Sequence, residues 1–184
     1  LTAQACGCPA CSGQHNEYNG PSFVSDYTAL ISGYSMSSTA GLGAFFTYSF
    51  PTEVPAYLYD IYTAEEMATF EEFSVAYQEV AREAVEAYAS ISGLTAFEAP
   101  AGQGDVQFMI FDLAVFSTNS WAGGFAYYPA TQAHGSDIFI DNDSTGNSTN
   151  LGILLHELGH ALGLQHPFDG DVRLEEKYDN YDYT

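Results

Sequence analysis

The sequence predicts an α+β domain in which a twisted mixed sheet of about five strands packs against two long helices. Three observations lead to this fold class. Short aromatic or β-branched segments bounded by glycine or proline recur between residues 44 and 140. One long stretch repeats apolar residues at helical spacing, and a second apolar stretch carries histidines four positions apart. A content of 46% apolar residues in 184 is enough for one domain with a real core.

The first quarter of the chain carries little regular pattern. Residues 1–22 are rich in Gly, Pro, Ser and Asn and are expected to form a mobile arm, which leaves residues 23–184 as the folded domain. Irregular structure is expected up to Gly43. Residues 44–50 are aromatic and β-rich and predict a buried strand. Two prolines in residues 51–62 suggest an extended connection.

A long helix is expected to end at Gly93. Thr63 with Glu66, or Thr69 with Glu72, offers a capping box at its start. An apolar stripe should pack on the sheet, and the glutamates between its members should lie in water. The stripe comprises Met67, Phe70, Phe73, Tyr77, Val80, Ala84, Tyr88 and Ile91, and the glutamates are Glu71, Glu79, Glu83 and Glu86.

Four further strands are predicted after this helix. The segments are residues 94–98, 105–111, 125–128 and 138–140. A turn at residues 100–104 separates the first two, and loops surround the third. The loop before the last strand contains His134, which is expected at the surface rather than at a metal.

The charge of the chain limits its partners. Twenty-four acidic residues against three basic ones give a formal net charge of −21. Such a surface repels nucleic acids and anionic membranes, and it attracts divalent cations. The sequence also has no apolar stretch of the length that spans a membrane. We therefore expect neither a nucleic-acid partner nor a membrane partner.

The stretch from Asn150 to Phe168 carries the chemistry. On a helix, His156 and His160 lie one turn apart on one face and can bind one metal ion, while Glu157 can reach a metal-bound water. Gly163 comes where the helix should end, and the following turn brings His166 as the third ligand. Three imidazoles with an open fourth position are typical of catalytic zinc. The pattern predicts hydrolysis by a zinc-activated water, with Glu157 as general base.

The residues from His156 to His166 form the metzincin signature His-Glu-x-x-His-x-x-Gly-x-x-His, and Pro167 after them resembles the serralysin family of secreted bacterial metalloendopeptidases. The similarity extends more weakly over residues 44–168. It implies a zincin fold with the zinc motif on the second long helix. It also implies a secreted zinc endopeptidase acting on extended polypeptides, with Ala126 and its neighbour Tyr127 on the substrate-side edge strand.

The sequence departs from this family in its last part. No methionine follows Met109, so the Met-containing turn beneath the zinc is missing, and so are the glycine-rich calcium-binding repeats. We therefore expect residues 23–184 to be the upper part of a catalytic domain that is cut short of its lower part. A separate segment carrying that lower part is one possible partner, and the sequence leaves the fate of that part open. One alternative is a latent or non-catalytic zincin fragment that binds zinc or a partner chain. Another is a metal hydrolase whose substrate is not a peptide.

Two further groups of residues suggest metal binding. Cys6, Cys8 and Cys11 cannot all pair with one another, and one hypothesis is that a thiolate occupies the open zinc position in a latent precursor. A disulfide with one thiol left over, or a lipid-attachment or linker segment, are the alternatives. Asp141 and Asp143 resemble the start of a calcium loop, although a turn that caps the zinc helix is the interpretation we favour.

Overall fold

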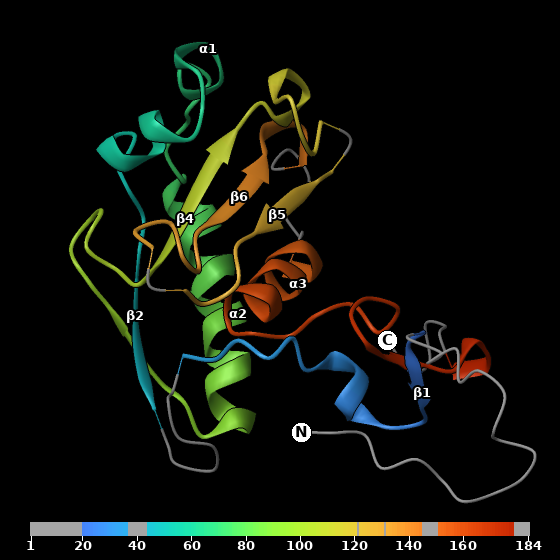
Figure 1. The fold of residues 1–184 in the computed structure, drawn as a ribbon. Helices are drawn as coiled ribbons and strands as arrows, with labels where there is room; N and C mark the ends of the chain where they lie inside the picture. Colours follow the sequence, from blue (N-terminus) through green and yellow to red (C-terminus); the bar gives the residue numbers. More distant parts are fainter. Residues whose placement is uncertain (1–19, 37–43, 121, 131, 145–150, 179–184) are drawn as a thin grey trace, which may run out of the picture. The chain divides into compact units, whose positions relative to one another are not determined.

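The computed structural model describes residues 20–36, 44–120, 122–130, 132–144 and 151–178 (Figure 1). The chain divides into two compact units. One unit is Leu30–Gln165, and the other combines Leu1–Ala29 with His166–Thr184. The three cysteines, and therefore the latent-thiol hypothesis, lie outside the described residues. Within those residues we find no helix whose length and apolar content would let it cross a membrane.

The larger unit contains a five-stranded mixed sheet, as the sequence predicts (Figure 1). Its strand order is β3-β2-β4-β6-β5. The pairings among β3, β2, β4 and β6 are parallel, whereas β5 runs antiparallel to β6 at the edge of the sheet. The strands are β2 Phe45–Ser49, β3 Thr95–Glu98, β4 Val106–Phe111, β5 Gly124–Ala126 and β6 Ile138–Asp141.

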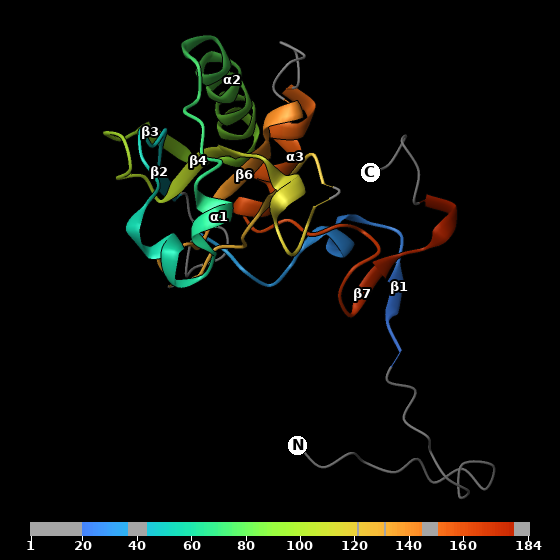
Figure 2. The ribbon, with the colours of Figure 1, turned by 90° about the horizontal axis from the view of Figure 1, so that it is seen from above.

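Strand β4 lies at the centre of the core and is buried along its whole length. Its side chains alternate between the two faces of the sheet. Phe108 and Ile110 join a cluster with the helices α2 Val75–Ser92 and α3 Leu151–Ala161. Met109 and Phe111 join a second, aromatic cluster on the opposite face, around Phe139. Figure 2 shows α2 and α3 on one side of the sheet and α1, Ala64–Met67, on the other.

The prediction of one long helix from Thr63 or Thr69 is wrong. The capping box of Thr63 and Glu66 is present, but it opens only the single turn α1. The chain then crosses the end of the sheet, where Glu71 N–H donates to the Ile110 carbonyl at 3.0 Å. The long helix α2 begins after Ser74, whose side chain accepts from Tyr77 N–H, and it ends at Gly93 in the left-handed conformation.

The expected apolar stripe is divided between the two faces of the sheet. Met67 and Phe70 pack in the aromatic cluster around Phe139, whereas Phe73 joins the cluster beneath α2. The helical spacing continues across the break only by coincidence, because the two segments pack on opposite faces of the sheet. Ile91 at the end of the stripe is 83% exposed, so its predicted burial is also wrong. The four glutamates are exposed as predicted.

Several short elements were not predicted. Residues 51–62, expected to be extended, contain the 3-10 helix Ala56–Asp60. The smaller unit contains β1 Ser22–Val24 and β7 Val172–Leu174, which pair in parallel. Irregular structure was expected around β1, and no structure was predicted around β7. The remaining short 3-10 helices are Tyr27–Leu30, Leu113–Val115, Asn142–Ser144 and Glu176–Tyr178.

A network of largely buried polar side chains joins the 3-10 helix Ala56–Asp60 to β4 and to the residue before β6. The Tyr57 hydroxyl donates to Asp137 Oδ2 at 2.7 Å and accepts from Gln107 Nε2 at 2.7 Å. Asp137 Oδ1 and Gln107 Oε1 have no hydrogen-bond partner within the described part of the chain. Burial raises the pKa of Asp137 to about 7, because the charged carboxylate loses its hydration.

We expect Asp137→Asn to stabilise the protein above neutral pH. The folded state holds the Asp137 proton up to pH about 7, whereas the ordinary pKa is 3.8, so wild-type stability should fall as pH rises across this window. Asparagine stays neutral, and the variant should gain roughly 1–3 kcal/mol at pH 8 and little near pH 4. Urea unfolding at both pH values measures the difference. Asp60→Asn, at an exposed position, should change neither value, and an equal gain there would contradict the assignment to Asp137.

Candidate metal centre

Helix α3 ends in a glycine turn that fixes the backbone after His160. Gly163 N–H donates to the His160 carbonyl at 2.9 Å, and Leu164 N–H donates to the Gly159 carbonyl at 2.9 Å. These two bonds make a Schellman motif, whose turning residue has a positive φ. Gly163 has a φ of 107°, and the prediction that it ends the helix is confirmed.

The turn also determines which nitrogen of His160 is available to a metal. His160 Nδ1 lies 2.8 Å from the Leu164 carbonyl oxygen, which can only accept, so Nδ1 carries the proton and neutral Nε2 carries a lone pair. His156 Nε2 lies 3.2 Å from His160 Nε2. Zinc–nitrogen bonds of about 2.0–2.1 Å in tetrahedral geometry separate two nitrogens by roughly 3.3 Å. The spacing of this pair therefore fits one zinc ion.

His166 directly follows the boundary between the two units. Its Nδ1 lies 3.0 Å from Asp169 Oδ2, an acceptor that fixes the same tautomer as in His160. His156 and His160 belong to the larger unit and His166 to the smaller one, so the binding of one metal ion by all three stays a prediction. The donor set, three imidazoles, suits zinc.

Glu157 is buried next to the histidine pair. The residue is 5% exposed, and its Oε2 has no hydrogen-bond partner among the described residues. Burial raises the pKa of Glu157 to about 7. A Cβ atom on Gly124 would lie 3.1 Å from Glu157 Cγ, so glycine at this position of β5 leaves room for the carboxylate. Glu157 therefore lies beside the edge strand with a carboxylate oxygen available for another partner.

Strand β5 presents the backbone of alternate residues away from the sheet. Tyr127 N–H donates to the Asp137 carbonyl at 3.0 Å, and the Gly123 carbonyl accepts from Asp141 N–H at 2.9 Å. In an antiparallel pair the intervening residues direct their N–H and C=O groups to the other side. Gly124 and Ala126 therefore face the open edge with their backbone groups.

Tyr127, the other predicted substrate-binding residue, is engaged within the sheet. Its hydroxyl lies 2.6 Å from that of Tyr62, and its ring meets His134 edge-on at 4.6 Å. His134 is half-buried in its loop. Tyr127 therefore supports the edge strand from within the sheet, while its neighbour Ala126 faces outward.

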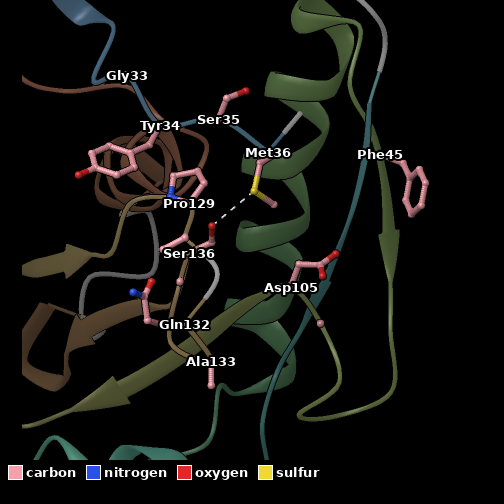
Figure 3. Close-up of a pocket in the computed structure, with 13 residues that line it drawn as sticks. Gly33, Tyr34, Ser35, Met36, Phe45, Asp105, Pro129, Gln132, Ala133 and Ser136 are labelled. Carbon is pink, nitrogen blue, oxygen red and sulfur yellow. Dashed lines mark hydrogen bonds between the residues drawn. The ribbon is translucent and has the colours of Figure 1, made fainter. Parts of the chain in front are cut away.

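Two aromatic residues beside the histidines were missed from the sequence. Tyr128 meets His160 edge-on at 5.9 Å, and it stacks on Tyr34 with ring centres 5.4 Å apart. Tyr34 also lines a cavity of about 930 Å³, between residues 33–36 and 129–136 (Figure 3). On its wall Ser136 donates to Met36 Sδ at 3.4 Å (Figure 3). For Tyr128, the only signal in the sequence was its place two positions after Ala126 on the predicted substrate-side strand.

The predicted calcium residues have other roles in the described structure. Asp141 Oδ1 accepts from Leu113 N–H at 2.9 Å and so anchors the loop after β4. Asp143 is exposed in a short 3-10 helix. Calcium binding by these residues stays a prediction, since the adjoining residues 145–150 lie outside the described part.

Comparison with known proteins finds similarity to metallopeptidases over part of the chain. The family model described as Peptidase M66 matches residues 130–183, which include the three predicted zinc ligands. Serralysin from Proteus mirabilis is 32% identical over 115 residues, covering 53% of this chain and 23% of that protein. Serralysin from Photorhabdus laumondii is 30% identical over 112 residues, covering 56% of this chain and 22% of that protein.

A third relative extends the match. Metalloprotease AprA from Pseudomonas entomophila is 31% identical over 133 residues, covering 67% of this chain and 26% of that protein. The chain is serralysin-like. The resemblance predicted from the zinc motif is thereby confirmed. This serralysin-like chain spans about a quarter of the length of the curated relatives it matches.

Proposed function

We propose that the chain carries the zinc-binding and substrate-binding part of a secreted, metzincin-type endopeptidase with a zincin fold. One observation carries the proposal: Glu157 is buried beside a histidine pair with zinc-ligand spacing, and one of its carboxylate oxygens has no partner among the residues that the structure describes. A buried carboxylate without a partner is destabilising in a purely structural role. Its position is reasonable if it receives a proton during a reaction.

Three histidines would hold the metal, namely His156, His160 and His166. When bound, zinc lowers the pKa of a water ligand to about 7 and polarises a carbonyl group. Glu157 takes the proton at Oε2 and then passes it to the leaving amine nitrogen. A raised pKa suits this role, because the group must both accept and release a proton near neutral pH.

The substrate is an extended polypeptide that adds a strand to the open edge of β5. The outward backbone groups of Gly124 and Ala126 provide the hydrogen bonds of such an addition. Gly124 also brings this edge close to Glu157. A peptide aligned on β5 would thus pass the general base, which favours a peptide over another type of hydrolysable substrate. A calcium site belongs to the same proposal.

Metal removal tests this function directly. We expect about one zinc per purified chain, and we expect cleavage of a denatured protein to stop with a chelator and return with zinc. His160→Ala should weaken zinc binding by more than about 100-fold, since it removes a ligand rather than a supporting group. His134→Ala is the matched control and should bind zinc like the wild type.

The possible results separate the alternatives. Bound zinc without cleavage would favour the non-catalytic or latent fragment. Cleavage that survives complete zinc removal would contradict the proposed mechanism. Zinc binding that is unchanged in His160→Ala would contradict the site.

A further inference from the structure

His166, like His160, has a hydrogen-bond acceptor beside its Nδ1 atom, and this acceptor comes from the loop between His166 and Leu174. Within it, Asp169 N–H donates to the His166 carbonyl at 3.1 Å, and the Asp169 carboxylate lies 3.0 Å from His166 Nδ1. The Phe168 ring stacks on the His166 ring, with centres 5.0 Å apart and planes inclined by 7°. Two consecutive residues thus restrain both the plane of the imidazole and its rotation.

The loop itself is held at both ends within the smaller unit. Leu174 N–H donates to the Pro167 carbonyl at 2.7 Å and closes the loop. Arg173 Nε donates to the Gly170 carbonyl at 2.9 Å, and Ser22 N–H of β1 donates to the Asp171 carbonyl at 2.7 Å. The carboxylate of Asp169 therefore extends from a closed turn and not from a free chain end.

The two histidines differ in the kind of acceptor that they use. His160 donates to the backbone carbonyl of Leu164, whereas His166 donates to a carboxylate. A carboxylate partner fixes the ring tautomer and also makes the ligand nitrogen more basic. We propose that Asp169 is a positioning residue for His166, which holds Nε2 ready for the metal. This inference rests on the proposed function, because it assumes that His166 is a zinc ligand.

The ion pair between Asp169 and His166 contributes little to the stability of the fold. The side chains of His166 and Asp169 are 36% and 50% exposed, and such exposed pairs contribute only about 0–1 kcal/mol to folding. Loss of the carboxylate should therefore leave the fold intact. Its effect should appear in metal affinity, where supporting acceptors are worth about 10–100-fold.

The test compares three variants of the whole chain by zinc competition with a chromophoric chelator. Asp169→Ala should bind zinc about 10–100-fold more weakly than the wild type. Asp169→Asn keeps an acceptor oxygen but loses the charge, so its affinity should lie between the two. Asp171→Ala removes the same charge from an exposed position of the same loop and should bind like the wild type. The visible spectrum of the Co²⁺-loaded proteins should change for Asp169→Ala and not for Asp171→Ala.

Each result decides between the two proposals. Zinc affinity of Asp169→Ala within about twofold of the wild type would overturn the role of Asp169 and leave the zinc site standing. Equal weakening by Asp171→Ala would overturn it too, since charge alone would then explain the loss. The proposed function itself would be overturned if the wild-type chain bound no zinc. It would also be overturned if the His160→Ala variant bound zinc as tightly as the wild type. All variants should have the same midpoint of urea unfolding. If Asp169→Ala unfolds, Asp169→Asn takes its place and should still bind zinc more weakly than Asp171→Ala and the wild type.

Discussion

Replacing Glu157 with glutamine is expected to lower turnover by about 10²–10⁴-fold while zinc stays bound. Glutamine has nearly the same shape, but it cannot take a proton from water. The orientation of His160 does not depend on the carboxylate, because the Leu164 carbonyl holds its ring. Loss of activity without loss of metal is therefore the specific result for a general base.

Cleavage rate per bound zinc is the quantity to measure, with metal content determined on the same samples. Glu83→Gln, at an exposed position on α2, serves as the matched control and should cleave like the wild type. Glutamine is neutral, so the metal-free Glu157→Gln chain should be at least as stable as the wild type at pH 8, above the raised pKa of about 7. A zinc-loaded Glu157→Gln chain that cleaves at the wild-type rate would show that the mechanism is wrong.

Replacing Gly163 with alanine should strongly destabilise the fold, although it adds only one methyl group. Gly163 has a φ of 107°, and a Cβ atom there would lie 2.3 Å from the Tyr34 carbonyl oxygen. Backbone strain and overlap together should lower the free energy of unfolding by about 2–4 kcal/mol. The same change disturbs the turn that holds the Leu164 carbonyl against His160, so zinc affinity should fall as well.

Gly152→Ala, near the start of α3, supplies the control for the change at Gly163 beyond its end. Within the described part of the chain, a Cβ atom at Gly152 meets nothing within 4 Å, and alanine is the better helix former, so this variant should gain about 0.5–1 kcal/mol. Urea unfolding of the two variants should therefore move in opposite directions. A Gly163→Ala chain as stable as the wild type would contradict the close approach of Tyr34.

The sequence predicted those features that depend on local spacing. His156, His160 and Gly163 follow from the helical period and from the need of a helix to end. The strands were found because glycine or proline bounds each apolar segment. The start of α2 was missed, since apolar residues on both faces of the sheet happened to continue one helical spacing.

Other features depend on contacts between distant residues and leave no local signal. Strands β1 and β7 have three residues each, which is too short for a recognisable alternation, and they lie about 150 positions apart. The contact of Tyr128 with His160 depends on how the edge strand meets α3. The unpaired oxygen of Asp137 depends on which groups the fold buries around it. Sequence patterns alone reveal none of these.

The acceptor for His160 is the main-chain carbonyl of Leu164, so the orientation of the imidazole does not depend on which side chain stands at position 164. The carbonyl orients the imidazole, while the Leu164 side chain is 38% exposed and contributes no atom to that contact. Proline is excluded, because the N–H of this residue bonds to the Gly159 carbonyl. Most other side chains can therefore replace leucine during evolution, so the surface next to the histidines can diversify without altering the way His160 is held.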